Sequence, residues 1–254
     1  RYNLEPTEFP PLTSEKGQAC MRHYVGQGAD WVEIETVIST SSDQIAVAPG
    51  SLIEQWEKDG MVSDDVWLKA GEQGFLCPMV PEQYGGVSTD FRYNCILNEE
   101  VGRSGCTGLG WTLHNDISVP YIVRYGSDFQ KDKYLPRCVS GELITAIAMT
   151  EPGAGSDLQG TKTTAVLDGD HYILNGSKTF ITNGQKAGLV IVVAKTDTTA
   201  GSKGISLLLV EADLPGFSKG KNLQKLGMKA QDTCELFFDK SSYFVPARET
   251  FSVD

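Results

Sequence analysis

The sequence predicts an α+β protein in which helices come first and strands follow. Two observations predict this order. Apolar residues recur at roughly the 3.6-residue helical period from about Leu52, and the period falls to about 2 from Leu143 onward. Strands and helices do not alternate after that switch, so a Rossmann-type sheet is not expected.

The first half of the chain carries the helical signals. Leu52, Ile53 and Trp56 share one face of a first helix. Ser63, followed by two aspartates, is a good N-cap for a second helix, and glycines at its far side are expected to end it. The predicted ending glycines are Gly71 and Gly74, a loop is expected over residues 78–86, and further helices over residues 90–102, 107–126 and 127–139.

The second half carries strand and turn signals. Asp168-Gly169-Asp170 predicts a three-residue hairpin loop, and Asn175-Gly176 is the strongest two-residue hairpin signal because both turn positions need a positive φ. Two near-continuous apolar runs are typical of strands buried on both faces. Strands are expected over residues 143–149, 163–167, 171–174, 177–181, 189–194, 205–210 and 233–238.

Residues 1–51 are expected to form a loose segment interrupted by prolines. Residues 1–50 hold three Lys or Arg against seven Asp or Glu, unlike an Arg-rich mitochondrial presequence, so no targeting segment is visible. The net charge of −11 argues against nucleic acid and anionic membrane surfaces as partners. No run reaches the roughly 20 apolar residues of a membrane span.

Neither cysteines nor histidines form a metal-ligand pattern. The six cysteines are interpreted as scattered buried thiols of a reducing compartment. His114 is expected to be a core or interface histidine, with proton transfer as the alternative, and His171 to lie at the surface. Glu99 and Glu100 are expected on a solvated face, since adjacent helical residues point about 100° apart.

Thr150-Glu-Pro-Gly-Ala-Gly-Ser-Asp157 leaves a predicted strand and turns sharply. Gly153 and Gly155 have no Cβ, so their backbone can approach a flat ring or a phosphate, and successive amides in such a turn can hold an anion. Thr150 offers a hydroxyl and an amide to a ring edge. The alternative is an ordinary tight turn in which Ser156 and Asp157 cap the next segment of the chain.

Thr179-Phe-Ile-Thr-Asn-Gly184 ends another predicted strand. A flavin ring needs an apolar wall and a few hydrogen bonds at its polar edge. Phe180 could supply the wall and Thr182 the hydroxyl. Ordinary strand packing is the alternative.

The two motifs in this order resemble the acyl-CoA dehydrogenase family, above all its long-chain-type and related bacterial members. Further matches extend the resemblance from about Leu52 to about Asp239, roughly three quarters of the chain. They are Glu54-Gln-Trp-Glu-Lys-Asp-Gly60, Leu68-Lys-Ala-Gly-Glu-Gln-Gly74, Pro81-Glu-Gln-Tyr-Gly-Gly86 and Lys225-Leu-Gly-Met-Lys-Ala-Gln-Asp-Thr233.

The resemblance implies a helical N-terminal domain over residues 52–145 and an antiparallel β-barrel middle domain over residues 146–240 that binds FAD. It implies that Ser156, Ser202 and Lys203 contact the acyl-CoA. The FAD-lining residues that it implies are Ile147, Ala148, Met149, Thr150, Glu151, Pro152, Gly153, Ala154, Gly155, Ser156, Phe180, Ile181 and Thr182. Glu151 is expected to be structural.

The implied reaction is α,β-dehydrogenation of a fatty acyl-CoA, with an electron-transferring flavoprotein as acceptor and a homodimer or homotetramer as assembly. The family's catalytic base is a Glu in a C-terminal four-helix bundle, which this chain is expected to lack, with residues 241–254 forming an atypical tail. No catalytic residue is therefore assigned, and a truncated or mis-assembled reading frame is hypothesised. Alternatives are a flavin monooxygenase or nitroalkane oxidase on the same scaffold, or a catalytically dead module. The expected compartment is the bacterial cytoplasm or the mitochondrial matrix.

Overall fold

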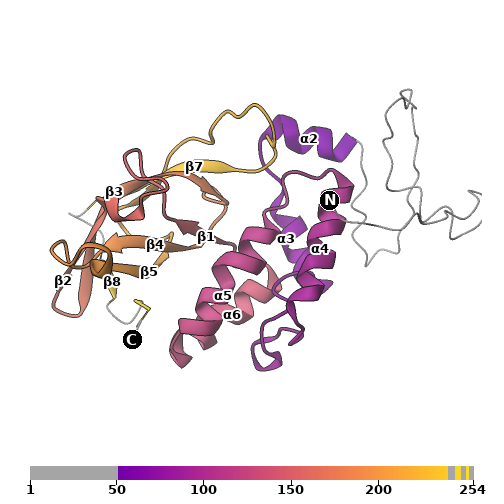
Figure 1. Ribbon diagram of the computed structural model, residues 1–254. Coiled ribbons are helices and arrows are strands. Elements are labelled where there is room, and N and C mark those ends of the chain that lie inside the picture. Colours follow the sequence, from indigo (N-terminus) through magenta and orange to yellow (C-terminus); the bar gives the residue numbers. More distant parts are fainter. Residues whose placement is uncertain (1–50, 240–243, 247–249, 252–254) are drawn as a thin grey trace, which may run out of the picture.

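The computed structural model describes residues 51–239, 244–246 and 250–251. Figure 1 shows a group of helices on one side and a curled sheet on the other. The predicted order of helices and then strands is confirmed. The expectations for residues 1–50, including His23 and Cys20, lie outside the described residues, as does most of the predicted tail after 240.

Capping residues define the ends of the helices. Ser127 begins α6 with a reciprocal capping box in which Gln130 takes part, and Gly141 ends it with a φ of 81°. Ser63 is the N-cap of α3, as predicted, although its side chain makes no capping hydrogen bond. The helices are α2 (Ser51–Asp59), α3 (Asp64–Glu72), α4 (Phe91–Ser104), α5 (Val119–Tyr125) and α6 (Asp128–Ser140), with a 3-10 turn η2 (Glu82–Tyr84) in the predicted loop.

Gly71 was predicted to end α3, and that prediction is wrong. It lies inside the helix, where a Cβ would stand 2.2 Å from the carbonyl oxygen of Ser140. The glycine therefore allows α3 to approach the last turn of α6 closely. Gly74, with a φ of 72°, follows the end of the helix as predicted.

The helix predicted over residues 107–126 is shorter and contains a wider turn. The segment η3 (Leu113–Ser118) is a π-helix that leads directly into α5, and the Val119 amide bonds the carbonyl of His114. Single π-turns inside α-helices occur often at functional sites. Here the π-turn contains His114, which contacts the first strand of the sheet.

Among the residues that the structure describes, the sheet has eight strands in the order β1-β4-β2-β3-β7-β6, with β5 paired to β4 and β8 paired to β3. Most pairs are antiparallel, but β4 pairs with β1 and with one end of β2 in parallel, so the sheet is mixed rather than wholly antiparallel. The long connection between β1 and β4 makes parallel pairing possible. The strands are β1 (Thr145–Ala148), β2 (Thr164–Asp168), β3 (His171–Thr182), β4 (Leu189–Lys195), β5 (Ile205–Glu211), β6 (Phe217–Lys219), β7 (Thr233–Phe238) and β8 (Phe244–Pro246).

The hairpin predicted at Asn175-Gly176 is wrong, because β3 runs through both residues without turning. Its first half pairs with β2 and its second half pairs with β7, so the strand changes partner at this point. Gly176 has a φ of 150°, and a Cβ there would meet Thr163 at 2.4 Å. The glycine serves close strand packing rather than a turn. The other hairpin is confirmed, but its predicted three-residue loop is wrong: Asp168 pairs directly with His171, which leaves a two-residue loop.

Strand β4 is buried on both faces, as its apolar run predicted. Leu189 and Ile191 pack into the core shared with the helices. Val190 and Val192 pack into the interior of the curled sheet. The two cores therefore lie on opposite faces of β4 and its neighbour β1. Their packing fixes the position of β1, and with it the point at which the chain continues into the segment after β1.

Candidate functional site

The segment after β1 forms a closed turn with an open backbone. Glu151 and Ala154 exchange both backbone hydrogen bonds, at 2.9 and 3.1 Å. Ile147 and Ala148 are buried on β1, whereas Pro152, Gly153, Gly155 and Ser156 are exposed. No atom lies within 4 Å of the position that a Cβ of Gly153 or Gly155 would take. The turn therefore presents bare main chain to the outside, where a ring or a phosphate can approach it.

The second predicted segment lies directly beside the first. The Thr179 amide donates to the Thr150 carbonyl at 2.9 Å. The pairing of β3 with β7 slips between Lys178 and Ile181, which marks a β-bulge. Within the bulge Phe180 has a φ of 58° and is 67% exposed, although Ile181 is buried. The structure thus joins the backbone next to Phe180 to Thr150, two residues after the end of β1, with Thr182 half-buried on the same segment as Phe180.

A buried ion pair ties these two segments. Lys178 on β3 has no exposed side-chain surface, and its Nζ donates to Glu151 Oε1 at 2.9 Å and to the carbonyl of Met149 at 3.0 Å. The carboxylate also accepts the amides of Lys162 (2.7 Å) and Thr163 (3.0 Å). Sequence reasoning did not single out Lys178. The available signal was a lone charged residue within the strand predicted over residues 177–181.

The pKa values of the pair follow from these contacts. Burial by itself raises the pKa of Glu151, but hydrogen bonds from Thr163, Lys178 and Lys162 hold that pKa below its usual value. Burial lowers the pKa of Lys178. Glu151 is therefore an ionised, fully engaged carboxylate at neutral pH, which agrees with its expected structural role.

The residues predicted to touch the coenzyme A portion lie close to the same turn. Ser202 and Lys203 are exposed on η5 (Gly201–Gly204). This turn contacts η4 (Leu158–Gly160), which comes directly after Ser156 and Asp157. The structure therefore places one exposed cation and two exposed hydroxyls on neighbouring turns.

The start of β1 is fixed by neutral polar groups. The Nε2 of His114 lies 3.0 Å from the carbonyl of Cys138, which can only accept, so Nε2 carries the proton. Its Nδ1 accepts from the Thr145 amide at 3.2 Å and lies 2.8 Å from the Thr145 hydroxyl. Burial lowers the pKa of His114 to about 4. The expectation of a satisfied core histidine is confirmed.

Asn183 joins the same region and was missed by sequence reasoning. Its amide donates to the carbonyls of Gly110 and Thr145 and accepts from Gln231. Asn183 is buried and has a φ of 60°, a conformation that asparagine tolerates better than most residues. Asn-Gly after Thr182 was the available signal for this geometry.

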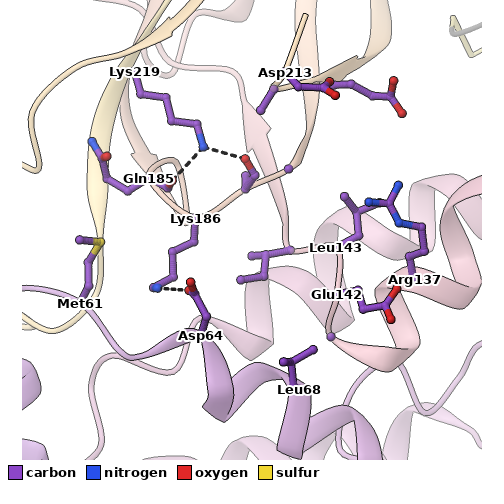
Figure 2. A pocket seen from close by; sticks show the side chains of 16 residues that line it. Met61, Asp64, Leu68, Arg137, Glu142, Leu143, Gln185, Lys186, Asp213 and Lys219 are labelled. Carbon is purple, nitrogen blue, oxygen red and sulfur yellow. Dashed lines mark hydrogen bonds and ion pairs between the residues drawn. The ribbon is translucent and has the colours of Figure 1, made fainter.

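A groove of about 720 Å³ opens between the helices and the sheet, and Figure 2 shows the side chains that line it. None of its residues belongs to the predicted flavin or coenzyme A segments. Lys186 is paired with Asp64, and Lys219 donates to the carbonyls of Gln185 and Ala187, both at 2.8 Å. The position of the exposed ring of Phe180 and the open turn, rather than the size of this groove, defines the candidate site.

The remaining predicted positions agree in part. Glu99 and Glu100 are exposed and pair with Arg103, as expected for a solvated face. His171 is half-buried beside Asp170. Of the cysteines that the structure describes, four are buried and Cys95 is exposed. Within residues 51–239 and the two short segments beyond, no helix is long and apolar enough to cross a membrane.

Comparison with known proteins identifies the family. A model described as the acyl-CoA dehydrogenase N-terminal domain matches residues 42–142, and one described as the acyl-CoA dehydrogenase middle domain matches residues 146–241. The chain belongs to the acyl-CoA dehydrogenase family. The resemblance predicted from the motifs is therefore confirmed.

Individual relatives agree with this assignment. The rat mitochondrial long-chain specific acyl-CoA dehydrogenase is 54% identical over 188 residues, which cover 73% of this chain and 44% of the relative. A crystal structure of an acyl-CoA dehydrogenase from Geobacillus kaustophilus superposes with a TM-score of 0.76 at 55% identity, covering 79% of this chain and 53% of that one. An acyl-CoA dehydrogenase from Bacillus anthracis, complexed with FAD, gives a TM-score of 0.71 at 35% identity, with coverages of 79% and 35%. This chain thus spans less than half the length of the rat relative.

Proposed function

We propose that this chain forms the N-terminal and middle parts of an FAD-dependent acyl-CoA dehydrogenase that introduces an α,β double bond into a fatty acyl-CoA. The observation that carries the proposal is the hydrogen bond between Thr179 and Thr150. It joins the residue before Phe180, which is exposed, to the residue before the turn that Glu151 and Ala154 close. The two motifs that name the family are therefore adjacent in space as well as ordered in sequence.

The residues present fit a flavin. Phe180 offers an apolar face that is largely free of protein contacts, and Thr150 and Thr182 offer hydroxyls at half-buried positions beside it. The exposed amides of Gly153 and Gly155 suit a pyrophosphate. Residues Ile147 to Ser156 with Phe180, Ile181 and Thr182 are the proposed FAD contacts. When bound, FAD would supply the acceptor for the hydride that leaves the substrate β-carbon.

The substrate end of the site is proposed at the neighbouring turns. Lys203 carries an exposed positive charge in a chain whose net charge is −11, so it is suited to a phosphate group of coenzyme A. Ser156 and Ser202 would add hydroxyl donors. The long-chain specificity of the rat relative suggests a fatty acyl group as the substrate class.

The catalytic base is proposed to come from outside the described residues. Glu151 is a carboxylate among the predicted flavin contacts, but Lys178 and two amides already occupy its oxygens. Removal of an α-proton needs a carboxylate that faces the substrate and is free to accept. We therefore propose that the 254-residue chain binds FAD but turns over little or no acyl-CoA by itself.

The wider setting follows from the family. Electrons would pass to an electron-transferring flavoprotein, and the complete protein would form a homodimer or homotetramer. The name of the rat relative includes a mitochondrial location. The mitochondrial matrix in a eukaryote, or the cytoplasm in a bacterium, is the corresponding proposal for this protein.

The test is an FAD titration of the purified chain, followed by visible absorption. A shifted and structured flavin band supports the proposal, and a spectrum equal to that of free FAD contradicts it. Addition of octanoyl-CoA or palmitoyl-CoA with an artificial electron acceptor then tests turnover. Robust oxidation by the isolated chain would overturn the proposed origin of the base.

A further inference from the structure

Lys178 and Glu151 form a charged pair inside the molecule, where charge is expensive. Their side chains are 0% and 5% exposed. Removing two ions from water costs several kcal/mol each, and an apolar pair of the same volume is often at least as stabilising. Stability alone therefore does not explain the pair, and its contacts indicate which backbone segments it holds in place.

Each partner reaches a different part of the loop. The Nζ of Lys178 bonds the Met149 carbonyl and the Glu151 carboxylate, on the two sides of Thr150. The carboxylate of Glu151 in turn holds the amides of Lys162 and Thr163, beyond the far end of the turn. One ion pair thus fastens both ends of the segment that contains Thr150 and the open glycines.

The same lysine is the last regularly paired residue of β3 before the bulge that contains the exposed Phe180. The register of β3 against β7 is regular up to Lys178 paired with Leu236 and resumes at Ile181 paired with Cys234. A bulge re-aims the side chains that it contains. Lys178 therefore bonds both neighbours of Thr150 and lies directly before the bulge that contains Phe180.

We propose that Lys178 and Glu151 together position the site. The pair holds the Thr150 turn in place relative to the Phe180 bulge. This inference rests on the proposed function for the identity of the ligand, FAD. The spatial relation itself is a property of the chain without ligand. It can therefore be measured separately.

The test uses the 254-residue chain with Lys178→Met and Glu151→Gln, and Lys219→Met as the matched control. Lys219 also donates to two carbonyls, but it lines the groove between the helices and the sheet. Hydrogen exchange of the Lys162, Thr163 and Ala154 amides is measured without ligand. FAD affinity and the bound-flavin spectrum are measured by titration.

We expect both pair variants to speed exchange of these amides about tenfold and to weaken FAD binding by about the same factor. Lys219→Met should leave both quantities within about twofold. If Lys178→Met does not fold, Glu151→Gln decides the question, because it keeps the side-chain volume and removes the charge. Unchanged exchange of the loop amides in the folded pair variants overturns the proposal, as does an equal effect of Lys219→Met.

Failure of the proposed function gives a different result. In that case the unaltered chain shows no shift of the flavin band, whereas the exchange measurement still decides whether the pair positions the turn. Faster exchange in both pair variants then supports the positioning role by itself.

Discussion

The two ends of β1 are fixed by different chemistry. At its start, Thr145 contacts His114 and Asn183, both of which are uncharged and hydrogen-bonded. Beyond its end, Met149 and Glu151 are held by the ammonium group of Lys178. A strand of four residues thus has a neutral anchor on the helical side and an ionic anchor on the side of the proposed site.

The difference indicates what each anchor does. The neutral contacts join the helices to the sheet, where apolar burial on both sides already supplies stability. The ionic anchor holds an exposed turn that has little apolar surface of its own to bury. A strong, directional interaction is needed there because packing cannot fix the backbone.

The largest expected effect comes from breaking the ionic anchor. Lys178→Met should lower the free energy of unfolding by about 3 kcal/mol, since it leaves a buried carboxylate unpaired. Urea denaturation measures this change. Lys69→Met is the control, because its ion pair with Asp65 is more than half exposed and should change stability by less than about 0.5 kcal/mol. Equal effects of the two substitutions would contradict the distinction.

The neutral anchor is expected to respond to pH. His114 has a folded-state pKa of about 4 against an ordinary value of 6.5, so the unfolded chain binds its proton more readily. Stability from this residue is fully present above pH 6.5 and is lost as the pH falls toward 4, by about 3 kcal/mol in the limit. Denaturation midpoints measured across this range should become lower as the pH is lowered. His114→Gln should reduce this dependence of the midpoint on pH.

The ionic anchor has a separate pH window. The pKa of Glu151 is held below its ordinary value of 4.5, so its contribution is present above that pH and is lost only below it. In the His114→Gln variant, the remaining loss of stability should therefore be confined to pH below about 4.5. A loss of stability that remains near pH 6 in this variant would show that a group other than His114 and Glu151 causes it.

Asn183 should separate backbone from side-chain effects at the neutral anchor. Asn183→Ala removes the contacts with Gly110, Thr145 and Gln231 and leaves alanine, which tolerates a positive φ less well than asparagine, at a φ of 60°. We expect a loss of about 2 kcal/mol. Asn183→Gly relieves the φ and should recover up to about 1 kcal/mol of that loss. Thermal denaturation of the two variants gives the comparison.

The smallest effect on stability is expected at Phe180. Because its ring is 67% exposed, Phe180→Ala should change the free energy of unfolding by less than about 0.5 kcal/mol. FAD affinity should nevertheless fall about tenfold if the ring forms the wall of the site. An unchanged affinity would move the flavin away from this segment.

Much of the fold could be predicted because its signals are local. Helical periodicity around Trp56, the cap at Ser63 and the unbroken apolar run of β4 each depend on a few neighbouring residues. The prediction failed at Asn175-Gly176 because the same dipeptide also permits a strand to pass close to Thr163. The prediction that Gly71 ends α3 failed for the same reason. The close approach of Ser140 depends on a residue far away in the sequence, so the residues around Gly71 do not reveal it.

The sequence by itself determined the family, the order of helices and strands, and the two segments that carry the proposed flavin contacts. Only the tertiary structure decided that Thr150 bonds Thr179, the neighbour of Phe180, and that the buried Lys178 bonds Met149 and Glu151 on either side of Thr150. It also decided that Glu151 is engaged and that His114 is neutral. The physical reason is that motifs and periods arise from neighbouring residues, whereas ion pairing, desolvation and strand register depend on residues far apart in the chain.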